Sequence, residues 1–161
     1  MIKNKPALVL SLRELKQKRK KFKNVALVGG VFDIIHPGHI RQLKQAKLIC
    51  DTLIVHVTGD KRAKEKKGVG RPILSEKERA EIVSAIRFVD YVFILNGKHY
   101  DQKIINVLRP NILIFHEEAF NDQVKEFVRN LKNFSGRVIT TRDKKNQSSS
   151  NIIKKLSLIK N

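Results

Sequence analysis

Short apolar runs alternate with longer amphipathic segments from one end of the chain to the other. Continuous runs of four or five apolar residues, many of them β-branched, are typical of buried strands. Such runs predict strands at residues 25–28, 53–57, 91–95, 112–115 and 138–141. Apolar residues spaced three or four positions apart predict helices at residues 11–22, 40–49, 75–89, 102–108, 122–134 and from about 150 onward. Strands and helices therefore alternate along the chain.

This alternation predicts an α/β fold, a Rossmann-like three-layer sandwich whose mainly parallel five-stranded sheet lies between two layers of helices. Strands that are apolar at every position must be buried on both faces, and helices on both sides of the sheet provide that burial. The ligand of such a sheet lies beyond the carboxyl ends of the strands. The residues that follow Val28, Val57 and Phe115 are therefore the first places to expect a site.

Two capping boxes mark the starts of predicted helices. Ser11 is followed three positions later by Glu14, and Ser75 is followed by Glu78 in the same way. The helix that opens at Ser75 is expected to carry its apolar face on Ile82, Ala85, Ile86 and Val89.

The size of the chain favours a single domain. Its 161 residues, 41% of them hydrophobic, suffice for one buried core and are few for two. We expect one domain over residues 1–161, with an N-terminal helix at about 11–22 and a core at about 24–156. The apolar runs are far shorter than the ~20 residues that cross a bilayer, and no signal-peptide pattern opens the chain, so we expect a cytoplasmic protein without a membrane partner. Cys50 is the only cysteine, which excludes an intrachain disulfide and a cysteine-based zinc site.

The charge of the chain sets the sign of its partners. Lys and Arg number 34 against 15 Asp and Glu, which gives a net charge of +19. Such a field attracts polyanions, and both nucleotides and nucleic acids fit. A basic nucleic-acid-binding module is therefore the alternative of another class. Aromatic residues make up only 6% of the chain, and no stacking-aromatic or zinc-finger motif occurs, so we expect nucleic-acid binding to be incidental.

The candidate chemistry is concentrated in residues 29–39, which read Gly-Gly-Val-Phe-Asp-Ile-Ile-His-Pro-Gly-His. This segment follows the first of the five predicted strands and opens a helix, where backbone N–H groups and the helix dipole can hold phosphate. The tight Pro-Gly turn between His36 and His39 can point both imidazoles into one pocket. Imidazoles can stabilise the negative charge that moves onto a leaving pyrophosphate. A zinc site would need further ligands, and none is spaced nearby.

The same residues resemble the signature of the cytidylyltransferase-like nucleotidyltransferases. That family includes glycerol-3-phosphate cytidylyltransferase, archaeal FAD synthetase and the nucleotidyltransferase domain of ADP-heptose synthase, to which the chain is most similar. The likeness spans about residues 12–156, and several ordered motifs at the family's spacing are far more specific than any one of them. Beyond residues 30–39 it is carried by Asp60, Lys67-Gly68, Arg71-Pro72, Glu78-Arg79, Val89-Asp90, Arg109-Pro110 and residues 148–153.

The resemblance implies catalytic roles for four side chains. His36 and His39 would bind and stabilise the triphosphate, Lys67 would lie on a loop that closes over the phosphates, and Arg79 would contact the nucleotide. The mechanism needs no enzyme nucleophile, because the substrate phosphate itself attacks the α-phosphorus in line. The expected nucleotide contacts come from Gly29, Gly30, Val31, Phe32, Asp33, Gly38, Asp60, Ser148, Ser149 and Ser150.

Several basic residues admit two interpretations. Residues 61–70 form a polar, glycine-punctuated stretch that we expect to be a mobile loop. Its Lys64 and Lys66, and Lys44 elsewhere, are candidate phosphate ligands, but a solvated lysine-rich surface explains such residues as well. Arg87 is a weaker candidate for the nucleotide, since a surface ion pair would also explain it.

The segment after the fourth predicted strand departs from the family. Relatives carry a glycine-rich stretch there, whereas this chain has His116, Glu117 and Glu118. These residues could bind a magnesium-bound triphosphate or a polar acceptor, or they could belong to a solvated loop.

The expected reaction transfers a nucleoside monophosphate, with AMP favoured, from a nucleoside triphosphate to a phosphorylated small molecule such as a sugar phosphate. The alternatives are cytidylyl transfer to glycerol phosphate or an aminoalcohol phosphate, and adenylylation of FMN. Mg²⁺ is the expected cofactor, because it bridges triphosphate oxygens with few protein ligands. The resemblance also implies a homodimer and a stand-alone transferase, whose phosphorylated substrate is made elsewhere.

Overall fold

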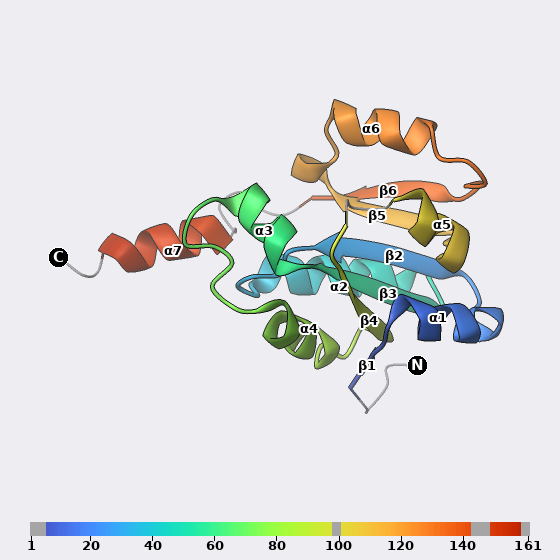
Figure 1. Ribbon diagram of the computed structural model, residues 1–161, viewed down its shortest axis with the longest axis horizontal. Helices are drawn as coiled ribbons and strands as arrows, with labels where there is room; N and C mark the ends of the chain where they lie inside the picture. Colours follow the sequence, from blue (N-terminus) through green and yellow to red (C-terminus); the bar gives the residue numbers. More distant parts are fainter. Residues whose placement is uncertain (1–5, 98–100, 143–148, 159–161) are drawn as a thin grey trace.

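The computed structural model describes residues 6–97, 101–142 and 149–158 (Figure 1). Within these residues, six parallel strands form one sheet in the order β1-β4-β3-β2-β5-β6. The strands are β1 (Leu8–Val9), β2 (Val25–Gly30), β3 (Thr52–Thr58), β4 (Tyr91–Leu95), β5 (Ile112–His116) and β6 (Arg137–Thr141). The predicted parallel α/β fold is therefore confirmed.

The sheet has one strand more than the sequence pattern predicts. Strand β1 contains only two residues and pairs with β4 at the edge of the sheet. Leu8 and Val9 are 53% and 48% exposed, so this strand lacks the long buried run by which the other strands are recognised.

Helices cover both faces of the sheet. The described helices are α1 (Leu12–Lys18), α2 (Pro37–Leu48), α3 (Asp60–Lys67), α4 (Glu76–Ser84), α5 (Gln102–Leu108), α6 (Asp122–Arg129) and α7 (Ser149–Ser157), with 3₁₀ turns at Arg19–Lys21 and Glu117–Ala119. Alternate residues of β2 enter opposite cores: Ala26 and Val28 pack in the core that contains residues of α2 and α4, and Val25 and Leu27 pack in the core that contains residues of α1 and α5, with α6 against it. The three-layer sandwich follows from this alternation.

Both predicted capping boxes are present. The Ser11 hydroxyl accepts from the Glu14 backbone N–H, and the Glu14 carboxylate accepts from the Ser11 backbone. Ser75 and Glu78 make the same reciprocal pair at the start of α4. Each box satisfies backbone donors that the first helical turn leaves without a partner.

The expected apolar face of α4 is partly wrong. The helix ends at Ser84, so Ala85, Ile86 and Val89 lie beyond it, and Ile82 is 40% exposed. The buried positions of the helix are instead Arg79, Ala80, Val83 and Ser84. A buried arginine inside the helix shifts the inward face away from the positions that hydrophobicity alone selects.

The expected mobile loop at residues 61–70 is also corrected. Most of it is helix α3, which begins after Gly59. Asp60 in the first turn and lysines in the last turn both favour this helix through its dipole. Gly59 provides no side-chain cap, and Ala63 is the one buried residue of the helix, so neither a capping signal nor an apolar face marks it in the sequence.

Helix α6 ends earlier than predicted, at Arg129 rather than near residue 134. Asn133 has a left-handed backbone with φ of 62°, which a continuing helix does not allow.

Candidate active site

The candidate site lies at the switch point of the sheet, where the chain stops adding strands on one side of β2 and begins to add them on the other. From β2 the chain adds β3 on one side, and β5 later joins β2 on the other side. A crevice at the carboxyl ends of two such strands is the usual ligand position in open α/β sheets. Strand β2 ends at Gly30 and β5 ends at His116, so these two residues lie at the carboxyl edge of the sheet, next to the candidate site.

The loop after β2 delivers two histidines to this edge. Phe32 is buried in this loop with a left-handed backbone, φ 52°, which a bulky residue adopts only where the surroundings hold it. His36 is the N-terminal cap of α2, with Pro37 in the first helical turn. The amino terminus of a twelve-residue helix therefore points its backbone N–H groups and the positive end of its dipole at the crevice.

The two imidazoles lie face to face. The ring centroids of His36 and His39 are 3.8 Å apart at an angle of 29°, and the His39 ring also contacts Phe32 at 5.0 Å. Burial, together with smaller effects of the charges of His36, His116 and Lys67, lowers the pKa of His39 to about 3. His39 is therefore neutral at physiological pH, when one ring nitrogen donates and the other accepts.

His39 has unused hydrogen-bonding capacity. Its Nδ1 atom is buried, and no described residue provides a hydrogen bond to it. Buried polar atoms in folded proteins are nearly always paired, so this atom at the carboxyl edge of the sheet indicates a ligand position. The stacking agrees with the prediction that the Pro37-Gly38 turn brings the two histidines together, and a shared ligand pocket stays a prediction.

The glycines before this loop have packing roles that the sequence did not reveal. A Cβ atom on Gly29 would lie 1.7 Å from Nε2 of the buried His56, and one on Gly30 would lie 2.9 Å from the Phe32 ring. These positions need glycine because neighbouring rings fill the space. Close approach of a phosphate to Gly29 or Gly30 stays a prediction.

Asp33 holds two loops together. Its buried carboxylate accepts from Arg71 Nε at 2.5 Å, from the Ile73 backbone at 2.7 Å and from the Leu74 backbone at 3.2 Å. The side chain that we expected to contact nucleotide is thus engaged within the protein. Its position fixes residues 71–74 against the loop that carries the histidines.

Arg79 connects three segments of the protein around the histidines. Its side chain is 0% exposed and donates to the backbone carbonyls of Val31 and Leu74, and to the Asp60 carboxylate at 2.6 Å. These partners engage the guanidinium within the protein, and the expected nucleotide contact of Arg79 stays a prediction. It joins α4 to the loop after β2 and to the start of α3.

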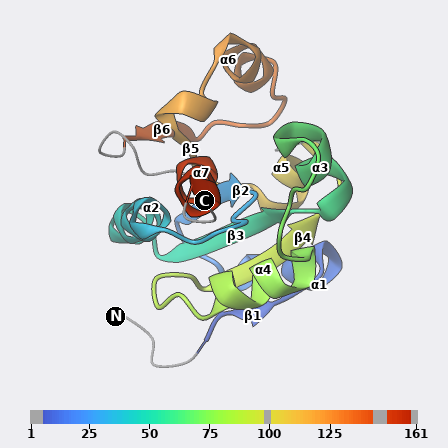
Figure 2. The same cartoon turned by 90° about the vertical axis from the view of Figure 1, so that its left-hand side faces the viewer.

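Helix α7 begins beside the loop of residues 31–36 between β2 and α2, which we call the histidine loop. Figure 2 looks onto the carboxyl edge of the sheet and shows α7 in front of it, with α2 on one side and α3 on the other. The Ser149 hydroxyl donates to the Ile34 carbonyl at 3.0 Å, and Ser150 is exposed. Ser148 lies outside the described residues. The two described serines are therefore placed beside the histidine loop, and a contact with nucleotide stays a prediction.

A basic cleft adjoins the crevice. It has a volume of about 480 Å³ and is lined by Asp60, Lys61, Lys64, Gly70, Arg71, Pro72, Leu74 and Ser75. Lys67, at the end of α3, is exposed and close enough to His39 to lower its pKa, after the larger effects of burial, His36 and His116. Lys44 and Lys66 are exposed, and the Arg87 guanidinium lies over the Phe88 ring at 5.9 Å.

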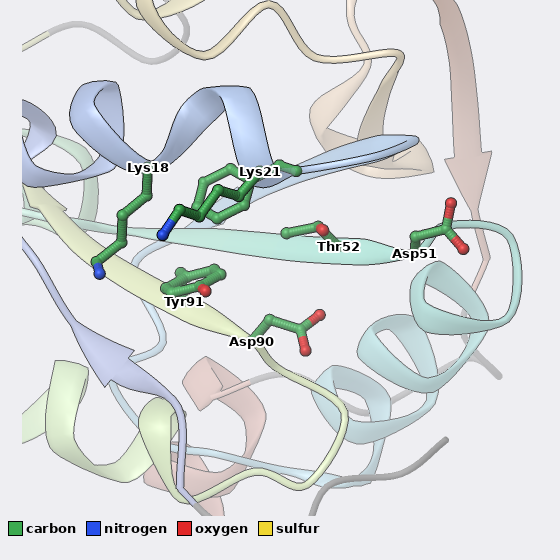
Figure 3. Close-up of a pocket in the computed structure, with 7 residues that line it drawn as sticks. Lys18, Lys21, Asp51, Thr52, Asp90 and Tyr91 are labelled. Carbon is green, nitrogen blue, oxygen red and sulfur yellow. The ribbon is translucent and has the colours of Figure 1, made fainter.

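A second hollow lies at the opposite edge of the sheet (Figure 3). It measures about 210 Å³, and Lys18 and Lys21 lie on one side of it with the carboxylates of Asp51 and Asp90 on the other. Asp90 is buried and accepts from the Leu53 backbone at 2.8 Å and from Lys47 Nζ at 2.5 Å. These internal contacts make Asp90 a structural group.

The described residues contain no group of three or more His, Cys, Asp or Glu side chains that could hold a metal ion. None of the helices in this part of the chain is long and apolar enough to cross a membrane.

Comparison with protein families decides between the classes that the sequence left open. The model of the cytidylyltransferase-like family matches residues 27–155. The chain belongs to this family. It is 36% identical over 148 residues to the bifunctional protein HldE of Desulfatibacillum aliphaticivorans, covering 88% of the chain and 29% of that protein. It is 41% identical over 126 residues to the FAD synthase of Thermococcus sibiricus, covering 74% of the chain and 81% of that protein.

Solved structures agree with this family assignment. A lipopolysaccharide core biosynthesis protein from Thermoplasma volcanium matches with a TM-score of 0.62 and 28% identity, over 76% of this chain and 98% of that one. Pantoate-β-alanine ligase from Francisella tularensis matches with a TM-score of 0.58 and 14% identity, over 96% of this chain and 78% of that one, and shows the fold alone. The predicted assignment to the nucleotidyltransferases is thus confirmed at the level of the family. The chain spans less than a third of the length of the HldE relatives that it matches.

Within this cytidylyltransferase-like domain, the sequence missed the side chains that hold the motif in place. Arg71 pairs with Asp33 across 38 positions, and the Thr58 hydroxyl donates to the Gly30 carbonyl at 3.1 Å across 28. Sequence spacing gives no signal for such distant partners. His56 carries a weak signal, since it is a polar residue inside an otherwise apolar strand.

Proposed function

We propose that this protein transfers a nucleoside monophosphate, with AMP preferred, from a nucleoside triphosphate to a phosphorylated small molecule and releases pyrophosphate. The observation that carries the proposal is the stacked pair His36 and His39 at the amino terminus of α2, with a buried Nδ1 atom of His39 that no described residue engages. Membership of the cytidylyltransferase-like family supports the same reaction.

Positioning and charge stabilisation are the protein's contributions to this reaction. A phosphate oxygen of the acceptor attacks the α-phosphorus, and the bond from that phosphorus to the bridging oxygen breaks as pyrophosphate leaves with the electron pair. In this mechanism the imidazoles of His36 and His39 and the N–H groups of α2 donate to triphosphate oxygens. Lys67 adds a positive charge near His39. Arg79 and Asp33 act indirectly, because they fix the loops that carry these groups.

A sugar phosphate is the first candidate for the phosphorylated acceptor. The identity to HldE over 88% of this chain supports it. Adenylylation of FMN is the second candidate, supported by the FAD synthase relative, of whose length this chain covers 81%. FMN adenylylation uses ATP, because FAD contains an adenylyl group. For the sugar phosphate, ATP is the preferred triphosphate of the proposal stated above. Cytidylyl transfer to glycerol phosphate or an aminoalcohol phosphate remains the third.

Mg²⁺ enters the proposal as part of the triphosphate substrate. The carboxylates nearest the crevice are already engaged: Asp33 pairs with Arg71, and Asp60 pairs with Arg79. This donor set suits an ion held mainly by phosphate oxygens and water, and it does not form a protein cage. Mg²⁺ bound in this way neutralises triphosphate charge.

The proposal also includes a homodimer, which the exposed edge of β1 supports, since Leu8 and Val9 are each about half exposed there. Sedimentation equilibrium tests it, with Leu8→Lys expected to yield monomers.

Pyrophosphate release tests the proposed function. The purified protein is given ATP, CTP, GTP or UTP with Mg²⁺, each against sugar phosphates, glycerol phosphate, phosphoethanolamine and FMN. We expect release from ATP that requires one acceptor and is abolished in His36→Ala. Release that requires CTP would move the assignment to a cytidylyltransferase. Absence of release with every pair, together with salt-dependent oligonucleotide binding, would favour the nucleic-acid-binding class instead.

A further inference from the structure

His116 is the residue at which this chain departs most clearly from the glycine-rich segment of its family, and the fold places it in the crevice. It is the last residue of β5, and β5 pairs directly with β2 through Val28 and Ile114. Two residues further along, β2 ends at Gly30 and β5 ends at His116. The imidazole therefore starts from the strand end that faces the histidine loop across the switch point.

Electrostatic coupling agrees with this placement. Burial and His36 lower the pKa of His39 most, and His116 adds a smaller effect, in agreement with the pairing of β5 beside β2. Lys67 acts on His39 in the same way from the end of α3. Three basic side chains from three different elements thus converge on one region: His39 from α2, His116 from β5 and Lys67 from α3.

The orientation of the His116 ring is fixed locally. Its Nδ1 atom accepts from the Glu118 backbone N–H at 3.4 Å, at the start of the 3₁₀ turn Glu117–Ala119. A ring whose Nδ1 accepts a hydrogen bond has its own N–H donor at Nε2. The donor of the ring is therefore Nε2–H, the atom farther from the backbone, which suits recognition of an anion in the crevice.

The neighbouring carboxylate is kept from repelling such an anion. Glu117 forms a two-bonded ion pair with Arg142, with Nε to Oε2 at 2.5 Å and Nη2 to Oε1 at 2.7 Å. Hydrogen bonding by Arg142 lowers the pKa of Glu117, so the pair stays ionised and its net charge is zero. The charge of Glu117 beside His116 is thus balanced by the guanidinium of Arg142, which follows β6.

We infer that His116 binds the phosphate group of the acceptor and holds it on the β5 side of the crevice, opposite the triphosphate held at the amino terminus of α2. This inference rests on the proposed function and names the residue that recognises the second substrate. The acceptor phosphate reacts as a dianion: one of its oxygens forms a bond to the α-phosphorus, the bond to the bridging oxygen breaks, and pyrophosphate leaves with the electron pair, so no proton is transferred. His116 donates a hydrogen bond throughout and forms no covalent bond.

A kinetic comparison tests the inference in the working enzyme. In His116→Ala, loss of a hydrogen bond to a charged group should raise the KM for the acceptor roughly 10- to 100-fold, while the KM for the triphosphate stays near the wild-type value. His116→Gln, which keeps an N–H donor at the end of the side chain, should recover part of the acceptor KM. Glu126→Ala, an exposed position on α6 that has no part in the site, is the control and should behave as wild type. An unchanged acceptor KM in His116→Ala, in a wild type that turns over, overturns the inference and leaves the proposed function intact.

A second measurement does not need turnover. Inorganic phosphate is titrated into the wild-type protein saturated with a non-hydrolysable ATP analogue, and the imidazole Cε1–H resonances are followed by NMR. The resonance that is missing from His116→Ala is expected to shift with saturation as phosphate is added. A His116 resonance that does not respond to phosphate contradicts the inference. If the wild type releases no pyrophosphate yet this resonance responds, the proposed function fails and the phosphate site stands.

Discussion

The two edges of the sheet both contain buried ionisable side chains, but they use them in opposite ways. At the amino edge, Asp90 accepts from the Leu53 backbone and from Lys47, so its charge is compensated inside the protein. At the carboxyl edge, the Nδ1 atom of His39 is buried with no hydrogen bond from a described residue. A satisfied polar group stabilises the fold, whereas an unsatisfied one costs stability unless a ligand completes it.

The same contrast holds for the lysines at the two edges. Lys18 and Lys21 share the amino-edge hollow with two carboxylates (Figure 3), so positive and negative charges offset each other there. At the carboxyl edge, Asp33 is paired with Arg71 and Asp60 with Arg79, and Lys61 and Lys64 of α3 line the same cleft as Asp60 and Arg71. We therefore expect positive charge on this chain to bind phosphate only where the nearby carboxylates are already engaged.

The largest expected difference between the edges is in turnover. His39→Asn should reduce kcat by roughly 100- to 1,000-fold, because it removes a donor aimed at developing negative charge. Its unfolding free energy should stay close to that of wild type, since no described residue depends on that nitrogen. Steady-state pyrophosphate release and urea denaturation measure the two quantities. A His39→Asn protein that retains wild-type kcat would contradict the claim that the carboxyl edge serves turnover through His39.

The amino edge should respond in the reverse way. Asp90→Ala removes the partner of Lys47 and of the Leu53 backbone N–H, and it should lower the unfolding free energy by roughly 2–3 kcal/mol. The activity per folded molecule should not change, because Asp90 lies at the far edge of the sheet from the histidines. Urea denaturation and active-site-normalised turnover report the outcome. A large loss of kcat at full folding would show that the two edges are coupled.

The glycine before the histidine loop gives an intermediate effect. Gly29→Ala places a methyl group 1.7 Å from His56 Nε2, and the overpacking should cost about 1–3 kcal/mol. Gly97→Ala is the matched control, because its added Cβ would lie 3.7 Å from the nearest atom, an ordinary contact. In a double-mutant cycle with His56→Ala, the two losses should be less than additive. Strict additivity would mean that the two positions do not compete for the same space.

The smallest expected effect is the pH dependence of stability. The pKa of His39 falls from 6.5 to about 3 on folding, mainly through burial. Between these values the unfolded chain binds a proton that the folded chain does not, so stability decreases as pH falls from about 6.5 toward 3. The loss due to His39 should reach about 0.8 kcal/mol at pH 6 relative to pH 8. Subtracting the profile of His39→Asn isolates it, and identical profiles for the two proteins would contradict the lowered pKa.

Local signals in the sequence predicted most of the fold. Capping boxes at Ser11 and Ser75 placed helix starts correctly, because both partners of each box lie within four residues. Helix α3 escaped prediction, because Gly59 offers no side-chain cap and Ala63 is its one buried residue. Strand β1 escaped because a strand of two exposed residues has no apolar run to detect.

The candidate site was predictable where its residues are contiguous and not where they are distant. His36 and His39 lie on one turn, and their convergence followed from the Pro-Gly pair between them. The internal partners of Asp33 and Arg79 could not be predicted, because they lie tens of residues away and only folding brings them together. A buried arginine and an exposed one look the same in a sequence.

Transfer of labelled phosphorus tests the central claim most directly. The protein is incubated with Mg²⁺, the acceptor identified by pyrophosphate release and ATP labelled at either the α- or the γ-phosphorus, in wild type, His39→Asn and Asp90→Ala. Nucleotidyl transfer at the carboxyl edge predicts α-label in the acceptor product, γ-label in pyrophosphate, near-complete loss in His39→Asn and wild-type transfer in folded Asp90→Ala. Appearance of γ-label in the acceptor, or undiminished α-transfer by His39→Asn, would contradict it.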